Sequence, residues 1–237
     1  MIEARRVTKS FGKLRVLDEL SISIRSGRIT GLVGPNAAGK TTLAKIILGL
    51  IKPDSGTVEI DGNLIGADDS YRSRIGYMPQ LSRFPENLSA RELFAMLTDL
   101  RNPARPLDDD LLQEFSFGGA LDKPIRALSG GTRQKVNAVI AFMFQPDLLI
   151  LDEPTAGLDP VSSGVLKAKV LGEKAAGKTF LLTSHIMSEL DELADDVAFI
   201  NDGRVAFVGA LTELKRITRQ SNLERAIAEM MKRGAAA

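Results

Sequence analysis

Residues 34–41 read Gly-Pro-Asn-Ala-Ala-Gly-Lys-Thr and fit the pattern G-x-x-x-x-G-K-[ST]. The segment before them, residues 28–33, is an apolar run typical of a buried strand, and the segment after them carries apolar residues at helical spacing. A strand that enters such a loop and leaves it as a helix directs backbone N–H groups toward a phosphate group. These residues therefore constrain the chain to an α/β fold with a parallel sheet around a phosphate-binding loop.

Two side chains of this loop have the chemistry that a nucleotide requires. Lys40 places a positive charge beside the outer phosphates, and the hydroxyl of Thr41 is an oxygen ligand suited to Mg²⁺. The alternative is a glycine-rich turn with a surface lysine. The strand before the loop and the helix after it favour the nucleotide site, because the pattern has its function in that context.

An acidic pair follows an apolar strand predicted over residues 148–151. Asp152 ends this strand, where its carboxylate can hold the shell of Mg²⁺, usually through water. Glu153 would point to the opposite face of a continuing strand, but Pro154 follows, so both carboxylates can turn toward one site. Glu153 is then the candidate base that polarises an attacking water, a role that contributes roughly 10²–10⁴-fold to a rate. The alternative is an acidic pair that merely ends a strand, and the phosphate-binding loop favours the functional interpretation.

Two patterns predict subdomains around this core. Residues 20–24 and 57–60 alternate like half-exposed strands, which indicates an antiparallel β subdomain near the N-terminus. Ser89 with Glu92 has the spacing of a capping box before a helical pattern. Prolines interrupt the segment afterwards, so residues 85–127 are interpreted as a small helical insertion.

The second half of the chain returns to the core. Residues 180–183 predict a second buried parallel strand, a hairpin turns at residues 201–203, and Ser221 with Glu224 predicts the start of a last helix. We therefore expect a P-loop NTPase core with a parallel sheet and helices, an N-terminal antiparallel β subdomain and a small helical insertion. The predicted boundaries are 1–84 and 128–215 for the core, 85–127 for the helical subdomain and 216–237 for the C-terminal helix.

Composition limits the classes of partner. The 237 residues carry 31 Lys and Arg against 30 Asp and Glu, a formal net charge of +1, which gives no support to nucleic-acid binding or to a general attraction to anionic lipid. Cysteine does not occur in the sequence, which excludes disulfides, thiolate metal sites and cysteine nucleophiles and fits a reducing cytosol. The longest apolar runs are far too short to span a bilayer, so a role at a membrane is expected to come through a partner.

Seven segments of the chain resemble the motifs of one family, the ATPase subunits of ABC transporters, and they occur in the same order. Leu-Ser-Gly-Gly-Thr-Arg-Gln-Lys at 128–135 matches the signature of that family. The resemblance covers nearly the whole chain and implies Mg²⁺-dependent hydrolysis of ATP. The other matches are Phe11 in Ser-Phe-Gly, residues 34–41, Gln80 in Gly-Tyr-Met-Pro-Gln, Asp152 with Glu153, residues 156–159 (Ala-Gly-Leu-Asp) and residues 183–185 (Thr-Ser-His).

The resemblance assigns a role to each motif. It implies that Glu153 polarises the attacking water, that His185 contacts the γ-phosphate, and that Gln80 reaches Mg²⁺ and senses the membrane partner. The implied ligands of Mg²⁺ are Thr41, Gln80 and Asp152. The expected nucleotide contacts are Phe11, which would stack on adenine, with Gly34, Asn36, Ala37, Ala38, Gly39, Lys40, Thr41, Thr42 and Asp152, and, across a dimer interface, Ser129, Gly130, Gly131 and Asp159.

Four of these assignments have plainer alternatives. Phe11 could be a core residue, and Gln80 could cap a loop. The segment at 129–131 could be a flexible linker, although its place before an amphipathic helix favours an anion site. His185 is the one histidine of the sequence, and a lone histidine is usually structural or exposed, but its place after a buried strand among these motifs reverses that expectation.

Two positions depart from the family pattern. Ala37 stands where the family usually has glycine, but it occupies a free position of the minimal pattern, so we expect binding to survive with slightly altered loop dihedrals. Thr132 replaces the commoner glutamine after Ser-Gly-Gly. Related subunits vary there, so inactivity is not inferred.

The resemblance also implies a head-to-tail dimer, in which the phosphate-binding loop of one copy and residues 129–131 of the other enclose each ATP. A helix N-terminus with small residues brings N–H groups close to a γ-phosphate, which agrees with this arrangement. We expect a homodimer, or a dimer with a similar ATPase subunit, bound to multi-span membrane permease subunits. The location implied is peripheral, on the cytoplasmic face of the inner membrane. Apolar Leu81 and Phe84 beside Gln80 mark the expected docking groove.

Shorter segments indicate the kind of transporter. Residues 82–88, 142–144 and 222–228 resemble ATPase subunits of the system that matures the copper sites of nitrous-oxide reductase. The residues predict no copper ligands, since cysteine does not occur and histidine occurs once, so the cargo is not expected to touch this chain. The alternative from another class is a soluble ABC ATPase of the iron–sulfur assembly type, which is similar in size.

Overall fold

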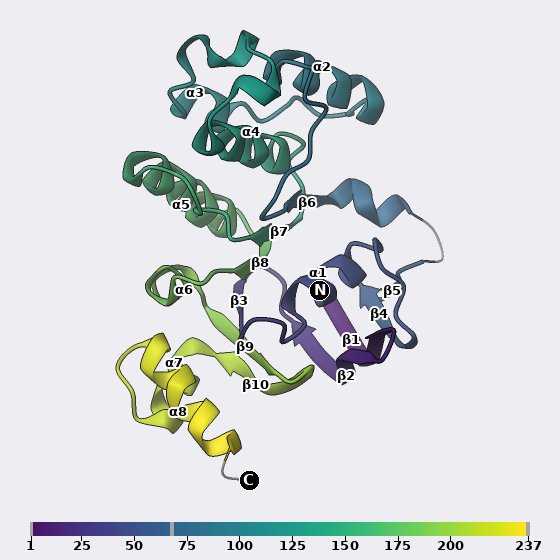
Figure 1. The fold of residues 1–237 in the computed structure, drawn as a ribbon, viewed down its shortest axis with the longest axis vertical. Coiled ribbons are helices and arrows are strands. Elements are labelled where there is room, and N and C mark those ends of the chain that lie inside the picture. Colours follow the sequence, from purple (N-terminus) through teal and green to yellow (C-terminus); the bar gives the residue numbers. More distant parts are fainter. Residues whose placement is uncertain (1, 67–68, 236–237) are drawn as a thin grey trace.

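A six-stranded sheet forms the centre of the computed structural model, which describes residues 2–66 and 69–235 (Figure 1). The strand order is β10-β9-β3-β8-β7-β6, and only β10, at one edge, runs antiparallel to its neighbour in the described sheet. The phosphate-binding loop therefore leaves β3 in the middle of the sheet. The strands are β3 (Ile29–Val33), β6 (Ile75–Met78), β7 (Leu148–Asp152), β8 (Thr179–Thr183), β9 (Asp196–Asn201) and β10 (Arg204–Ala210).

Both faces of this sheet are buried, because the period of two along each strand sends neighbouring side chains into different cores. Leu149 and Leu151 of β7 belong to one hydrophobic cluster, whereas Leu148 and Ile150 belong to another. The first cluster includes residues of α4 (Gly130–Phe142), α5 (Pro160–Ala175) and α6 (Met187–Leu193), and the second includes residues of α1 (Lys40–Ile47).

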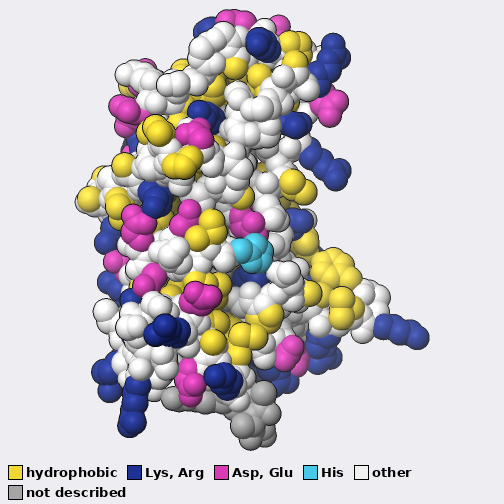
Figure 2. Space-filling view, turned by 60° about the vertical axis from the view of Figure 1, so that its left-hand side comes forward, with side chains coloured by type: hydrophobic (Ala, Val, Ile, Leu, Met, Phe, Trp, Pro, Cys, Tyr) yellow, Lys and Arg dark blue, Asp and Glu magenta, His cyan; other side chains and the backbone are white. Residues whose placement is uncertain are grey.

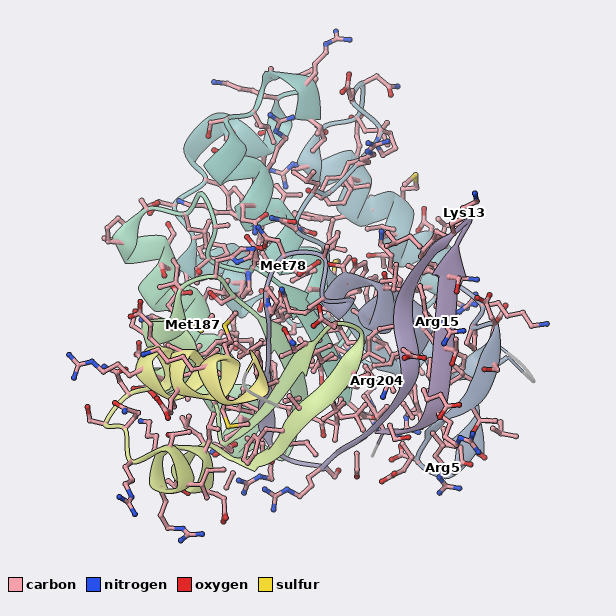
Figure 3. The ribbon with its side chains drawn as sticks, turned by 60° about the horizontal axis from the view of Figure 1, so that its bottom comes forward. Arg5, Lys13, Arg15, Met78, Met187 and Arg204 are labelled. Carbon is pink, nitrogen blue, oxygen red and sulfur yellow. The ribbon has the colours of Figure 1, made fainter. Side chains whose placement is uncertain are left out.

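An antiparallel sheet packs against the second cluster in the order β2-β1-β4-β5. A salt-bridge network ties it to the central sheet, since Asp18 pairs with Arg15 at 2.7 Å and with Arg204 at 2.6 Å. Figure 3 labels the two arginines. The two sheets also touch through backbone, where the Asp18 N–H donates to the Gly203 carbonyl at 3.0 Å. The strands are β1 (Ile2–Phe11), β2 (Leu14–Ile24), β4 (Ser55–Ile60) and β5 (Asn63–Leu64).

The helical segment lies at one end of the molecule, away from α7 and α8 (Figure 1). Its first helix, α2 (Ala90–Arg101), begins at the capping box predicted from Ser89 and Glu92: the Ser89 hydroxyl accepts from the Glu92 N–H, and the Glu92 carboxylate accepts from the Ser89 N–H. The other elements of this segment and the one before β6 are short: α3 (Asp110–Glu114), η1 (Ser70–Arg74), η2 (Gly118–Asp122) and η3 (Ile125–Ala127).

The C-terminal region differs from the single helix expected over 216–237. The structure has α7 (Leu211–Thr218) and α8 (Leu223–Ala235), because Arg219 adopts a left-handed φ of 56° and ends the first helix. Asn222, rather than Ser221, accepts from a helix N–H, that of Arg225 at 3.0 Å. Residues 236–237 lie outside the described residues.

The predicted fold class is confirmed: a parallel-strand sheet with helices is joined to an antiparallel subdomain and a helical insertion. The sequence interpretation did not identify β1, β5, β6, α5 or α6. No helix within the described ranges is both long and apolar enough to cross a bilayer.

Candidate functional site

A hollow of about 520 Å³ opens at the carboxyl ends of β3 and β7, where parallel strands deliver their loops. It brings together residues that lie up to 174 positions apart in the sequence, from Phe11 to His185. Its lining residues are Phe11, Leu14, Val16, Asn36, Ala37, Ala38, Gly39, Lys40, Thr41, Thr42, Gln80, Asp152, Glu153 and His185.

The phosphate-binding loop wraps so tightly that two of its positions require glycine. Gly34 has φ 158°, and a Cβ there would lie 2.1 Å from the Ile200 carbonyl oxygen. Gly39 has φ 102°, and a Cβ there would lie 2.5 Å from a methyl of Leu17. Ala37, the departure from the family pattern, also adopts a left-handed φ of 63°. Alanine therefore occupies a conformation that glycine adopts more easily, which gives the substitution a small cost in backbone strain.

Lys40 spans the loop from within. Its ammonium donates to the carbonyl oxygens of Gly34 at 2.7 Å and Pro35 at 2.9 Å. Burial lowers the pKa of Lys40, and the nearby carboxylates of Asp152 and Glu153 oppose that shift. The lysine thus bridges two carbonyl groups of the loop, and its charge interacts with the carboxylates of Asp152 and Glu153.

Asp152 and Thr41 place oxygen atoms together at the floor. The Thr41 hydroxyl lies 3.4 Å from a carboxylate oxygen of Asp152, and the Thr183 hydroxyl donates to the other oxygen of Asp152. No group of three or more His, Asp or Glu side chains within the described ranges could hold a metal unaided. The carboxylate and hydroxyl nevertheless suit Mg²⁺, because that ion takes one or two protein oxygens and completes its shell with water and substrate phosphates.

Glu153 turns toward the same hollow as Asp152. β7 ends at Asp152, and Glu153 adopts a left-handed φ of 52°, which reverses the alternation of a continuing strand. Its N–H donates to the carbonyl and hydroxyl oxygens of Thr183, both at 3.1 Å. Its carboxylate meets Nε2 of His185 at 2.7 Å. Figure 2 shows His185, the one histidine of the sequence, in cyan at the surface of the molecule.

Two further residues predicted from the sequence, Phe11 and Gln80, also line the hollow. Phe11 is 48% exposed, so it is not a core residue, and the ammonium of Lys9 lies 5.5 Å from its ring centroid. Gln80 lies two residues after the end of β6 and lines the hollow. Leu14 and Val16, which the sequence interpretation missed, lie beside Phe11; their alternation along β2 is the signal that could have indicated them.

The Ser-Gly-Gly segment forms a helix N-terminus rather than a linker. The Ser129 hydroxyl accepts from the Thr132 N–H at 3.2 Å and lies 2.9 Å from the Thr132 hydroxyl, so threonine at this position supports the cap. A Cβ on Gly131 would lie 2.8 Å from the Gly157 carbonyl oxygen. Ser129, Gly130 and Gly131 are not among the residues that line the hollow of the same chain.

Asp159 also stays outside the hollow. Its carboxylate caps α5 by accepting from the Ser162 N–H at 2.9 Å and from the Ser162 hydroxyl at 2.6 Å, and Lys135 lies 3.4 Å away. These contacts, led by the Ser162 hydroxyl bond, lower the pKa of Asp159 to about 2. The buried Gln134 ties α4 to the acidic pair, because its amide donates to the carbonyl oxygens of Glu153 and Pro154 at 3.3 and 3.1 Å.

Comparison with known proteins places these features in one family. Residues 17–156 match the sequence profile described as ABC transporter. The chain is 40% identical over 210 residues to the Nod factor export ATP-binding protein I of Sinorhizobium fredii, covering 86% of this chain and 61% of that protein. It is 35% identical over 233 residues to the daunorubicin resistance ATP-binding protein DrrA3 of Streptomyces coeruleorubidus, covering 96% of this chain and 74% of that protein.

Solved structures agree with this placement. An ATP-binding subunit of an ABC transporter superposes with a TM-score of 0.89 at 28% identity and covers 98% of this chain and 99% of its own. A dimeric bacterial ABC transporter cassette shares the fold, with a TM-score of 0.79 at 23% identity, over 89% of this chain and 99% of its own. The chain therefore belongs to the ABC transporter family, as one of the ATP-binding subunits that serve as the ATPases of these transporters.

Proposed function

We propose that this chain binds and hydrolyses ATP and transmits the energy to membrane permease subunits. The observation that carries the proposal is the contact between Glu153 and His185, 2.7 Å apart, beside an intact phosphate-binding loop. Glu153 is the general base that polarises the attacking water, and His185 positions that water against the γ-phosphate. Lys40 and the loop N–H groups bind the phosphates, and Phe11 stacks on adenine with Leu14 and Val16 alongside.

Mg²⁺ fits the oxygen atoms at the floor of the hollow. Thr41 and Asp152 would hold it, and Gln80 also lines the hollow. When bound, the ion neutralises charge on the β- and γ-phosphates. Thr183 fixes the orientation of Asp152, and the buried Asp152 is thereby kept from swinging out of the floor.

We also propose that each ATP is enclosed between two chains. The support is the separation within one chain: residues 129–131 cap α4 outside the hollow and leave Gly130 exposed with open space around it. The positive end of the α4 dipole then needs an anion from elsewhere. A head-to-tail second copy supplies the γ-phosphate to this end, and Asp159 lies at the same face as a contact across the interface. The dimeric state of the fold relative named above is consistent with this arrangement.

The proposed partner is a multi-span permease, which docks an amphipathic cytoplasmic helix with an acidic residue. A groove of about 220 Å³ supports this, because it combines apolar walls with arginines. The Arg101 guanidinium lies 4.5 Å from the Phe144 ring centroid. The groove is lined by Leu48, Leu50, Arg72, Ile75, Gly76, Tyr77, Leu97, Arg101, Ile140 and Phe144.

This groove refines the expectation based on Leu81 and Phe84. Leu81 is 79% exposed but does not line this groove, and Phe84 packs partly against the core, so its substitution would perturb the fold. Leu50 and Arg101 are better probes. We expect Leu50→Asp and Arg101→Glu to release the chain from membranes that contain its permease while ATP hydrolysis by the purified chain is retained.

Val208→Asp is the matched control, because Val208 is also exposed but lies on β10, at the opposite edge of the central sheet from β6, whose Ile75 and Tyr77 line the groove. Equal membrane association of Leu50→Asp, Arg101→Glu and the unsubstituted chain would refute docking at the groove. Docking to a permease in this way would place the chain peripherally on the cytoplasmic face of the inner membrane.

The cargo is proposed on narrower grounds. Maturation of nitrous-oxide reductase copper sites is supported by the resemblance of residues 82–88, 142–144 and 222–228. The names of the relatives, Nod factor export and daunorubicin resistance, favour an exported molecule as the alternative cargo. The runner-up function is a soluble ATPase of cofactor assembly. Co-purification from solubilised membranes followed by mass spectrometry separates these, since recovery without any multi-span protein would refute the transporter proposal.

A further inference from the structure

Glu189, on α6, reaches two loops of the active site. Its Oε2 atom accepts from the Thr155 hydroxyl at 2.6 Å and is approached by the Ser184 hydroxyl at 3.3 Å. Both hydroxyl-bearing residues are buried, each with 8% of its surface exposed. A carboxylate in such a place is stabilised chiefly by these donors, so its position and theirs depend on one another.

These contacts close a ring that contains the catalytic pair. Thr155 follows Glu153 by two positions, Ser184 directly precedes His185, and the Glu153 carboxylate meets His185 at 2.7 Å. The ring therefore runs from Glu153 to Thr155, through Glu189 to Ser184, and back through His185. Glu189 is its only member that belongs to neither loop.

The backbone of Glu153 explains why such a link is needed. Its left-handed φ of 52° is disfavoured for a side chain with a Cβ and persists only where the surroundings fix it. On the N-terminal side the N–H of Glu153 is fixed by two bonds to Thr183. On the C-terminal side the Thr155–Glu189 bond is the side-chain contact that ties the loop to α6.

The geometry points to Glu189 as a positioning residue for ATP hydrolysis. Its carboxylate holds the loops after β7 and β8 at the separation that lets Glu153 and His185 meet. Glu189 does not line the nucleotide hollow, so it acts through these loops and not on the substrate. The inference rests on the roles proposed above for Glu153 and His185, and it adds the element that couples them.

The test compares three variants of the full chain: Glu189→Ala, Glu189→Gln and the control Glu192→Ala. Glu192 pairs with Lys167 at 2.6 Å on the surface near Glu189 and touches neither loop. For Glu189→Ala we expect kcat to fall roughly 10- to 100-fold, the scale of a misplaced catalytic group. The Kd of a non-hydrolysable ATP analogue should stay within about twofold, because ground-state binding is untouched. Glu189→Gln should recover most of kcat, since its carbonyl oxygen still accepts from Thr155, and Glu192→Ala should keep full activity.

Unchanged kcat in Glu189→Ala would overturn the proposal, and so would a glutamine variant as slow as the alanine variant. If Glu189→Ala does not fold, Thr155→Val removes the same bond with little change of volume and should slow kcat alone. In the folded series, the double variant Thr155→Val with Glu189→Ala should be no slower than the slower single variant, whereas additive losses would contradict a shared contact. A Glu153→Gln chain with normal turnover would refute the proposed base; an inactive Glu153→Gln chain beside a fully active Glu189→Ala chain would refute only the positioning role.

Discussion

Lys169 on α5 joins the helical insertion to the core through two carboxylates of the insertion, Asp108 and Asp110, and also pairs with Glu173 of its own helix. Its ammonium lies 2.6 Å from Asp108, 2.6 Å from Asp110 and 2.9 Å from Glu173, and its side chain is 9% exposed. Burial lowers the pKa of Lys169, but the hydrogen bonds to Asp108, Asp110 and Glu173 outweigh it, so the pKa lies well above its ordinary value. The ammonium of Lys169 therefore offsets the negative charge of these three carboxylates, and no other salt bridge to them is found among the described residues.

Lys169→Met keeps the length of the side chain and removes its charge. Asp108 and Glu173, with 12% and 20% of their side chains exposed, would then repel each other in a poorly solvated place, whereas Asp110, at 67%, stays screened by solvent. Loss of a fully buried partner costs about 3–5 kcal/mol, and solvent reduces this to about 2–3 kcal/mol here. For a chain of this size that lowers Tm by about 5–10 °C.

The control is Lys167→Met on the same helix, whose partner Glu192 is 52% exposed. Such a surface pair contributes less than about 1 kcal/mol, so Tm should fall by no more than about 3 °C. Differential scanning calorimetry of both variants at pH 7 measures the difference. Equal losses in the two variants would refute the assignment of Lys169 as the link between insertion and core.

The pH dependence follows from the sign of the shift. A pKa of Lys169 above its unfolded value of 10.5 gives a contribution that is fully present below that value and is lost as the pH rises through the folded pKa. The contribution is therefore complete at neutral pH. The loss in Lys169→Met should therefore stay constant between about pH 6 and 9 and shrink as the pH rises above 10.5, where the unsubstituted chain loses the same contribution. A loss that changes between about pH 6 and 9, or that persists undiminished at higher pH, would contradict the charge argument.

Three further predictions concern single residues of the site. Ala37→Gly relieves a left-handed φ of 63° and should raise the free energy of unfolding by about 0.5–1 kcal/mol, measured by urea denaturation; a decrease would contradict the strain. Asp159→Ala removes the cap of α5, and because the folded pKa of about 2 lies below the ordinary 3.8, its Tm deficit should be full above pH 3.8 and shrink as the pH falls toward 2; a constant deficit would exclude the carboxylate as its source. Phe11→Ala should weaken ATP binding roughly tenfold or more in calorimetric titration with Tm unchanged, since the ring is half-exposed, and unaltered affinity would remove it from the adenine site.

The local parts of the site could be predicted from the sequence because neighbouring residues determine them. The glycines of the phosphate-binding loop are set by backbone conformation, and the turn of Glu153 beside Asp152 follows from Pro154 ending the strand. The capping box of α2 depends on two residues three positions apart. In each case the physical constraint acts within a few residues, so the pattern carries it.

The contacts that the sequence did not reveal join distant segments. Thr155 and Glu189 are 34 positions apart, and Lys169 lies 61 positions from Asp108. No periodicity or spacing links such pairs, because tertiary packing alone brings them together. β1 was missed for a related reason: its pairing with β2 contains register shifts, so its alternation is interrupted.

The composite active site is tested most directly by the association state of an ATP-loaded chain. Glu153→Gln, incubated with ATP and Mg²⁺ and followed by sedimentation velocity, should form a dimer, because in the proposed arrangement the trapped γ-phosphate would bridge Lys40 of one copy and Ser129 of the other. Adding Ser129→Arg, at an exposed helix cap outside the hollow of its own chain, should leave the protein monomeric while each monomer still binds ATP. A double variant that dimerises with ATP as readily as Glu153→Gln would contradict the shared site.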